Sequence, residues 1–224
     1  MSNVFEISSK LKTDLYTEDY FERGIECRIS AYTRYRWIPE LTIPMAMTMI
    51  DYLGICRGET VLDYGCSMGF LVKAFRMLYR KSYGVDISRY ALENAHPDVS
   101  FWCRHVDEIY SMGNDYYDFC ISKDVFEHIK GPELERLCQT IRTKKLFVII
   151  PLGENGKYVA PANDLDVTHV ICKDRYWWER FFTSAGWRVL SFSYRVEGIK
   201  DVYEEWEKAF GFFVLEKQKQ ALCC

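Results

Sequence analysis

The stretch Thr60-Val-Leu-Asp-Tyr-Gly-Cys-Ser-Met-Gly69 decides the fold that this sequence predicts. It begins as a buried strand that carries an acid, Asp63, near its end, and it continues into a turn between Gly65 and Gly69. A helical pattern from Phe70 to Arg80 follows directly. Backbone at such a strand-to-helix turn can approach a ligand closely, and the start of the helix offers free N–H donors.

A second acid stands at the end of the next strand pattern, which runs from Ser82 to Asp86. A carboxylate at that place in a doubly wound sheet can accept hydrogen bonds from both hydroxyls of a ribose. The turn and this acid together predict a site for an adenosine-containing cofactor.

Strand and helix patterns alternate along the centre of the chain, which is typical of a doubly wound α/β sheet. The expected strands are 60–64, 82–86, 99–104, 116–122, 145–150, 187–194 and 209–215, and the expected helices are 68–79, 90–95, 132–142 and 174–185. The apolar run 145–150, stopped by Pro151, is typical of a strand buried on both faces. Gly186 stands where a helix C-cap glycine belongs.

Two segments lie outside this alternation. Residues 1–58 precede the first strand and carry helical patterns at 14–23 and 43–53, so we expect an N-terminal helical cap before a domain of residues 59–224. Residues 151–173 are expected to form a long irregular connection. Long loops after parallel strands often hold the chemistry of such folds.

Composition excludes several classes of protein. The chain has 224 residues, 49% hydrophobic and 27% charged, with a net charge of −3, which argues against a general nucleic-acid binder. No apolar run approaches the ~20 residues of a membrane span, and the polar start resembles no signal or transit peptide. The nine cysteines include no Cys-x-x-Cys pair, so we expect reduced thiols in a cytoplasmic protein.

Two other interpretations of the turn account for fewer features. A nicotinamide-binding turn needs Gly-x-Gly-x-x-Gly, but the third glycine would fall at Phe70. A hydrolase elbow, Gly-x-Ser-x-Gly, does match residues 65–69, with Asp164 or Asp166 and His169 as later partners. That elbow normally follows several sheet strands, whereas here it ends the first, and a hydrolase has no use for a ribose-type acid at Asp86.

The ordered set of motifs resembles class I S-adenosylmethionine-dependent methyltransferases. Asp63-x-Gly65-x-Ser67-x-Gly69 is similar to their Asp/Glu-x-Gly-x-Gly-x-Gly signature, with Ser67 in place of the middle glycine. The likeness continues at 85–88, 118–129 and 212–216. It implies a Rossmann-like, doubly wound, seven-stranded sheet whose last strand is antiparallel, and an enzyme that transfers a methyl group.

The same resemblance implies the cofactor contacts. Asp63 and the backbone of the turn would face the methionine part, Asp86 would hold the ribose, and Ile87 would pack on adenine. An acid or neighbour at the end of the third strand would meet the adenine amino group, and the fourth-strand end would lie beside the methyl-bearing sulfur. The full expected set is Asp63, Gly65, Cys66, Ser67, Gly69, Asp86, Ile87, His105, Val106, Asp107, Ser122 and Lys123.

Acceptor activation requires a base if the acceptor is a hydroxyl. His128 and His169 both follow strands at the expected cofactor edge, and either could be that base, since imidazole titrates near neutral pH. Asp124 and Asp166 could orient the base or bind a sugar hydroxyl. Glu127 is either an acid of the turn without a chemical duty or a contact to cofactor or substrate.

A narrower resemblance concerns the acceptor. Segments 20–24, 35–41, 151–153, 157–158, 164–169 and 194–198 are similar to methyltransferases encoded with surface-glycan and sugar-modification genes in bacteria and some viruses. It implies O-methylation of a sugar or glycan hydroxyl. Expected substrate-binding residues are Tyr35, Arg36, Trp37, Lys157, Tyr158 and Arg195.

Other expectations complete this prediction. No metal is expected, because no spacing is diagnostic, although Asp164, Asp166 and His169 could hold Mg²⁺. We expect a monomer or homodimer in the cytoplasm, that of the host if the chain is viral, acting on a small molecule or glycan and not on nucleic acid. A protein or nucleic-acid methyltransferase and a non-catalytic cofactor-binding subunit remain the alternatives.

Overall fold

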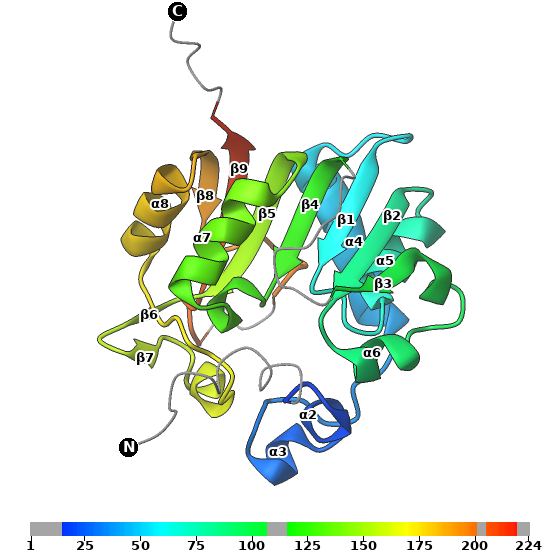
Figure 1. Cartoon of the computed structure of the whole chain (residues 1–224), viewed down its shortest axis with the longest axis horizontal. Helices are drawn as coiled ribbons and strands as arrows, with labels where there is room; N and C mark the ends of the chain where they lie inside the picture. The colour runs from blue at the N-terminus through cyan, green and yellow to red at the C-terminus, as the bar shows by residue number, and fades with distance from the viewer. Residues whose placement is uncertain (1–14, 107–115, 201–204, 219–224) are drawn as a thin grey trace, which may run out of the picture.

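The computed structural model describes residues 15–106, 116–200 and 205–218. Its centre is one seven-stranded sheet with the order β3-β2-β1-β4-β5-β9-β8 (Figure 1). The strands are β1 Thr60–Tyr64, β2 Lys81–Asp86, β3 Cys103–His105, β4 Tyr117–Lys123, β5 Thr143–Pro151, β8 Trp187–Ser193 and β9 Phe210–Lys217. Strands β1 to β5 are parallel, and β9 runs antiparallel to β5 and β8. The predicted doubly wound fold, with its antiparallel last strand, is confirmed.

Helices cover both faces of the sheet. The helices are α2 Glu18–Glu22, α3 Gly24–Cys27, α4 Pro39–Leu53, α5 Phe70–Met77, α6 Arg89–Glu93, α7 Gly131–Thr140 and α8 Arg175–Ser184. Helices α7 and α8 pack on one face, and α4 and α5 pack on the other. Strand β5 serves both cores, because Leu146 and Val148 point to the first while Phe147 and Ile149 point to the second. This alternation explains why the strand reads as a continuous apolar run.

The segment before β1 divides into two parts. Helix α4 buries Ala46, Met49 and Leu53 in the core beside β1 and β5, so it belongs to the layer on the sheet. Helices α2 and α3 lie beyond the carboxyl ends of the parallel strands, near α6 (Figure 1). There Tyr20 and Phe21 pack against Met68 at the glycine turn. The division of the chain at residue 58 stays a prediction.

Several expected elements differ in their bounds from those observed, among them the strand 99–104 and the helix 43–53. The predicted strand 99–104 is wrong in its first half, where Ser100–Trp102 form a 3₁₀ turn before the short β3. The N–H groups of Val99 and Ser100 both donate to the carbonyl of His96, which curls the chain before it can extend. Helix α4 begins at Pro39, four residues earlier than predicted, and includes Pro44.

The connection after β5 is less irregular than predicted. It contains a small hairpin, β6 Gly153–Glu154 with β7 Lys157–Tyr158, and a 3₁₀ turn over Pro161–Leu165. Asn155 and Gly156 join the two strands with positive φ of 52° and 77°, the backbone that a type I′ turn requires. The hairpin directs the following residues back toward the carboxyl edge of the sheet.

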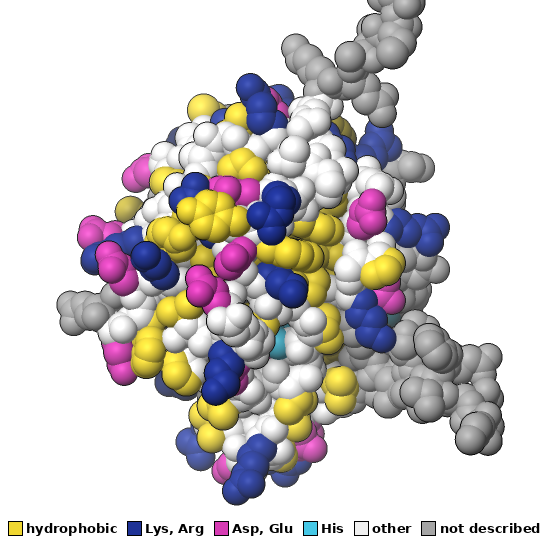
Figure 2. All heavy atoms as spheres, turned by 90° about the vertical axis from the view of Figure 1, so that its left-hand side faces the viewer, with side chains coloured by type: hydrophobic (Ala, Val, Ile, Leu, Met, Phe, Trp, Pro, Cys, Tyr) yellow, Lys and Arg dark blue, Asp and Glu magenta, His cyan; other side chains and the backbone are white. Residues whose placement is uncertain are grey.

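The surface carries mixed charge on the side where α8 and β8 lie. Figure 2 shows basic and acidic side chains interspersed there with hydrophobic ones. Tyr176 on α8 and Leu190 on β8 are among the exposed apolar residues. No helix within the described residues is long and apolar enough to span a membrane.

Candidate active site

The glycine turn after β1 is tightly folded against its neighbours. Gly65 has φ of +85°, and a side chain there would place its Cβ 2.3 Å from a methyl of Val125. Gly69 has φ of +76° and would meet the sulfur of Cys103 at 2.8 Å. Ser67 between them also adopts positive φ, 50°. At both positions glycine is therefore required for two reasons: the backbone has positive φ, and a neighbouring side chain leaves no room for a Cβ atom.

Asp86 holds this turn from the neighbouring strand. Its Oδ2 accepts a hydrogen bond from the N–H of Ser67 at 2.7 Å, and its Oδ1 accepts one from Ser88 at 2.7 Å. The hydroxyl of Ser88 donates to the carbonyl of Tyr16 at 2.6 Å and so attaches the N-terminal segment to the same site. Burial raises the pKa of Asp86, against the lowering effect of these N–H groups.

Asp63 is a second buried carboxyl at the same edge. It lies in β1 between Gly84 of β2 and Ile121 of β4. Burial raises the pKa of Asp63 to about 7, the nearby Asp86 adds to that rise, and Lys123 opposes it. A ligand cation beside Asp63 would restore the carboxylate at neutral pH.

A cavity of about 480 Å³ opens over the turn. Its walls come from the carboxyl ends of β1, β2 and β4 and from the segment that holds α2 and α3. Aromatic rings supply much of that cover, namely Tyr16, Tyr20, Phe21, Tyr32, Tyr35 and Phe70. The predicted residues that line it are Tyr35, Arg36, Asp63, Gly65, Cys66, Ser67, Asp86, Ile87, Val106, Lys123, Asp124 and His128. Its volume suits a small-molecule ligand.

Asp124 forms an ion pair with two lysines at the end of β4. Its Oδ2 lies 2.7 Å from the Nζ of Lys123 and 2.5 Å from the Nζ of Lys200. Although burial opposes the effect, these ammonium groups hold the pKa of Asp124 well below its usual range. Burial lowers the pKa of Lys200 to about 8, and Lys123 adds to that shift. A carboxylate held in this way is a structural counter-ion and a weak base.

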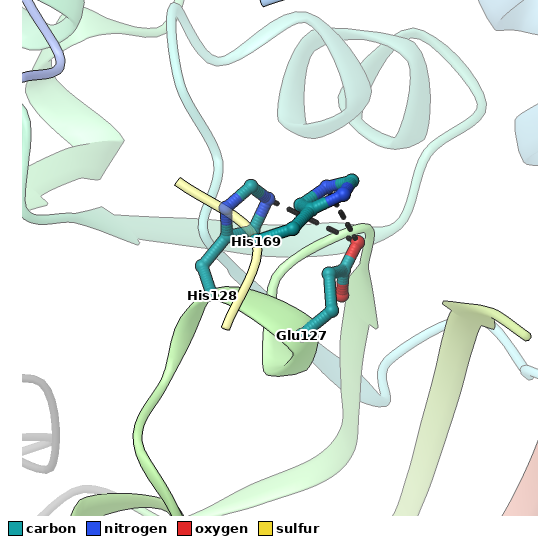
Figure 3. Close-up of side chains that lie close together, drawn as sticks. All are labelled: Glu127, His128 and His169. Carbon is teal, nitrogen blue, oxygen red and sulfur yellow. Dashed lines mark ion pairs between the residues drawn. The ribbon is translucent and has the colours of Figure 1, made fainter. Parts of the chain in front are cut away.

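Glu127, His128 and His169 form a compact cluster, in which both imidazoles are directed at the carboxyl of Glu127 (Figure 3). The Nε2 atoms of His128 and His169 lie 3.9 Å and 3.8 Å from Oε1 of Glu127. Glu127 has no exposed surface, and burial raises its pKa well above the usual range. Burial also lowers the pKa of His169.

A second layer of hydrogen bonds orients the two imidazoles. Nδ1 of His169 lies 2.8 Å from the carbonyl oxygen of Asn163, so it carries the proton. Nδ1 of His128 lies 2.7 Å from the hydroxyl of Thr168, which in turn donates to Asp166 at 2.5 Å. In the neutral rings, the lone pairs are then on the Nε2 atoms that face Glu127.

Residues 61–144 match the family model described as a methyltransferase domain. The seven-stranded sheet with its antiparallel last strand is the fold of solved S-adenosylmethionine-dependent methyltransferases. No curated protein sequence matches the chain.

Solved methyltransferases share the fold of this domain. The 1,6-didemethyltoxoflavin-N1-methyltransferase of Burkholderia thailandensis, solved with S-adenosylhomocysteine, is 14% identical, covers 98% of this chain and 92% of its own, and gives a TM-score of 0.63. The methyltransferase in complex with the Trm112 activator of Haloferax volcanii is 13% identical over 81% of this chain and 92% of its own, with a TM-score of 0.62. An S-adenosylmethionine-dependent methyltransferase of Clostridium acetobutylicum is 11% identical over 80% and 92%, with a TM-score of 0.60.

Several residues predicted for the methyltransferase site lie outside the cavity lining. Gly69 lies in the turn, where it faces Cys103, and Ser122 is buried in β4. His105 forms a hydrogen bond through Nε2 with the carbonyl of Ile87 at 3.0 Å. Val106 lines the cavity, and Asp107 lies outside the described residues.

Four predicted substrate residues are also placed elsewhere. Trp37 packs on Phe70, and Lys157 is exposed on β7. The hydroxyl of Tyr158 donates to the carbonyl of Ile171 at 2.9 Å. Arg195 pairs with Glu197 and is 54% exposed. The cavity therefore gives these four no support as substrate-binding residues, whereas Tyr35 and Arg36 do line it.

The hydrolase alternative for the turn lacks its catalytic pair. Nδ1 of His169 bonds to a backbone carbonyl, and Asp166 instead accepts from the hydroxyls of Tyr20 and Thr168. Asp164 accepts from the N–H of Tyr158 at 3.2 Å. No acid thus orients His169 through Nδ1 as a triad requires.

Some residues that line the cavity were not among the expected site residues. Tyr16 and Tyr32 are two of them, although aromatic residues are frequent in the segment that holds both. Lys200 pairs with a residue 76 positions away, and no local pattern marks it.

Proposed function

We propose that this methyltransferase domain moves a methyl group from S-adenosylmethionine to a hydroxyl of a sugar or glycan. One observation carries the proposal: a single cavity lies on the glycine turn, is covered by aromatic rings and has an imidazole, that of His128, in its lining. Aromatic rings suit flat or sugar ligands, because they offer large apolar faces with polar edges.

The residues of the turn fit the methyl donor. The carboxylate of Asp63 would pair with its ammonium group, and backbone N–H groups of the turn would face its carboxylate. Asp86 uses its oxygens for two N–H groups, yet each carboxylate oxygen has a second acceptor site that a ribose hydroxyl can occupy. Ser67 lines the cavity beside Tyr35, so its hydroxyl is available to a bound donor.

The bound donor would supply an electrophilic methyl, to whose carbon the acceptor oxygen bonds as the carbon–sulfur bond breaks and leaves its electron pair on sulfur. The protein must align the acceptor and take up the hydroxyl proton. Of the four residues predicted as catalytic, His128 and Asp124 line the cavity, whereas Asp166 and His169 stand behind them. Because Asp124 is committed to two lysines, we assign acceptor activation to His128.

Residues 15–38 would form the lid over the acceptor, within the N-terminal cap expected from the sequence. A small molecule or glycan fits a cavity of about 480 Å³ better than a nucleic acid, for which the net charge of −3 is unsuitable. We further propose a cytoplasmic monomer or homodimer.

Binding of the donor should depend on pH through Asp63. Because the pKa of Asp63 is about 7 in the free protein, its carboxylate becomes available to an ammonium group only as the pH rises. The affinity for S-adenosylhomocysteine should therefore increase by about 8-fold between pH 6 and pH 7.5. Isothermal titration calorimetry across this range measures the change, and Asp63→Asn should remove it.

The stability of the ligand-free protein provides the control for this prediction. A carboxyl whose pKa rises on folding retains a proton that the unfolded chain has lost, so stability falls as pH rises from 3.8 toward 7. Denaturation midpoints of the wild type should follow that direction more steeply than those of Asp63→Asn. Equal slopes for the two proteins, in binding and in stability, would exclude the assigned protonation state.

The proposed reaction is tested with the donor labelled in its methyl group. Incubation with nucleotide-sugar and glycan pools, followed by mass spectrometry, should find a methylated sugar, and His128→Ala should reduce its formation by about 100-fold or more. Labelled product on protein or nucleic acid alone would refute the sugar assignment. Binding of S-adenosylhomocysteine by His128→Ala confirms that the cofactor site survives.

A further inference from the structure

Glu127 is a buried acid whose carboxyl oxygens lack hydrogen-bond partners among the described residues. Its side chain has no exposed surface, and neither carboxyl oxygen has a hydrogen-bond partner there. An uncompensated buried carboxyl group destabilises the folded protein. The Nε2 atoms of His128 and His169 lie 3.9 Å and 3.8 Å from Oε1 of Glu127, beyond hydrogen-bond range.

Two segments of backbone bring Glu127, His128 and His169 together. Glu127 and His128 lie in the 3₁₀ turn after β4, and His169 comes from the connection after β5. The N–H groups of Val170 and Ile171 both donate to the carbonyl of Glu127, at 2.8 Å and 3.0 Å. Two hydrogen bonds to one carbonyl fix the segment that carries His169 against the turn that carries the acid.

The three candidate ligand atoms lie slightly farther apart than the ligands of an occupied metal site. One carboxyl oxygen of Glu127 and one ring nitrogen of each histidine all lie within 4.8 Å of one another. Figure 3 shows both imidazoles beside the carboxyl group. Ligands ~2.1 Å from a common cation are themselves ~3.0–3.5 Å apart, so each imidazole would need to approach the carboxyl by about 0.3–0.9 Å.

The second layer of the cluster has the form that metal-binding histidines require. Each imidazole donates its Nδ1 proton, to the carbonyl of Asn163 in one case and to the Thr168–Asp166 pair in the other. Such bonds fix the tautomer and leave Nε2 as the ligand atom. Asp166 and Asp164, considered from the sequence as metal ligands, are engaged in other hydrogen bonds.

We propose that Glu127, His128 and His169 bind a divalent transition-metal cation. Two imidazoles and one carboxylate favour Mn²⁺, Fe²⁺, Co²⁺ or Zn²⁺ over Mg²⁺ and Ca²⁺, which prefer oxygen ligands. Three protein ligands leave coordination positions open, as in sites where a metal meets a substrate. Because His128 lines the cavity, the cation would lie at its edge.

The role of this cation in turnover rests on the proposed function, whereas its binding does not. An acceptor hydroxyl bound to the cation loses its proton more readily. The O–H bond breaks, its electron pair stays on oxygen, and the proton passes to water. With a cation bound, His128 would serve as its ligand, and the cation would replace the imidazole as the group that activates the acceptor hydroxyl.

Metal binding is measured without any methyl transfer. Protein stripped with a chelator and dialysed is titrated with Mn²⁺, followed by the electron paramagnetic resonance of free Mn²⁺, and with Zn²⁺ by calorimetry. Mn²⁺ is the primary probe, because the nine cysteines of the chain compete poorly for it. We expect one cation per chain, and spin-echo modulation of bound Mn²⁺ from imidazole nitrogen, in the wild type.

Variants locate the cation. Glu127→Gln and His169→Gln should weaken its binding by about 100-fold, while His96→Gln, a histidine beside Lys73 and Asp98, should bind like the wild type. Retained binding of S-adenosylhomocysteine shows that each variant is folded. The proposal is overturned if the wild type binds neither cation stoichiometrically, if imidazole modulation is absent, or if both cluster variants bind as well as His96→Gln. A cation without methyl transfer would instead refute the proposed function and leave the site intact.

Discussion

Asp86→Ala is expected to lower the affinity for S-adenosylhomocysteine by about 100-fold and to destabilise the protein as well. The carboxylate accepts from the N–H groups of Ser67 and Ser88, both at 2.7 Å, and it is the proposed ribose ligand. Two charged hydrogen bonds to ribose hydroxyls contribute about 3 kcal/mol, which corresponds to a factor of about 150 in affinity. Calorimetric titration measures this loss.

The same substitution removes the acceptor that the turn needs. Two N–H groups lose their partner, at about 1 kcal/mol or more each, so the free energy of unfolding should fall by about 2–4 kcal/mol. Asp51→Ala, at an exposed acid on α4, is the matched control and should change neither quantity. Affinity in Asp86→Ala within 3-fold of the wild type would contradict the ribose assignment, whatever happens to stability.

Gly65→Ala should have the second large effect, through shape and not through charge. A Cβ at this position meets a methyl of Val125 at 2.3 Å, and the backbone has φ of +85°. Left-handed strain costs about 1–2 kcal/mol, and overpacking adds about 1–3 kcal/mol. Thermal unfolding should occur about 6–12 °C lower than in the wild type, and cofactor affinity should fall because Val125 and the turn line the same cavity.

Gly54→Ala separates the two causes. Gly54 also has positive φ, +68°, but nothing lies within 4 Å of the Cβ that would be added. Its cost should be the strain alone, about 1 kcal/mol, with no effect on cofactor binding. Adding Val125→Ala to Gly65→Ala should cost less than the sum of the two single changes. Equal unfolding temperatures for Gly54→Ala and Gly65→Ala would contradict the close approach.

Local patterns predicted the part of the site that the chain builds from neighbouring residues. The strand 60–64 is observed with the predicted bounds, and the turn follows it, because strand, glycines and helix are consecutive. Asp86 was found in the same way, as the acid at the end of the next strand. Each feature depends on periodicity and on backbone freedom, which a sequence displays directly.

Local sequence patterns could not predict the contacts between segments that are distant in the chain. Tyr16 and Tyr32 line the cavity, and Ser88 holds the N-terminal segment there through the carbonyl of Tyr16. Lys200 pairs with Asp124, which is 76 positions away. Glu127 left two interpretations open, and its burial with two imidazoles emerges only when the connection after β5 folds back. One local signal was overlooked: Asn155-Gly156 is a strong hairpin pattern, and the hairpin is present.

The central claim is that the cavity over residues 65–69 binds the adenosyl methyl donor, and calorimetric titration of the wild-type chain with S-adenosylhomocysteine at pH 7.5 tests it most directly. We predict saturable binding of one molecule per chain, with an affinity that Asp86→Ala lowers by about 100-fold. A folded wild-type protein that gives no binding heat at ligand concentrations up to about 1 mM, and no shift of its unfolding temperature there, would contradict the account.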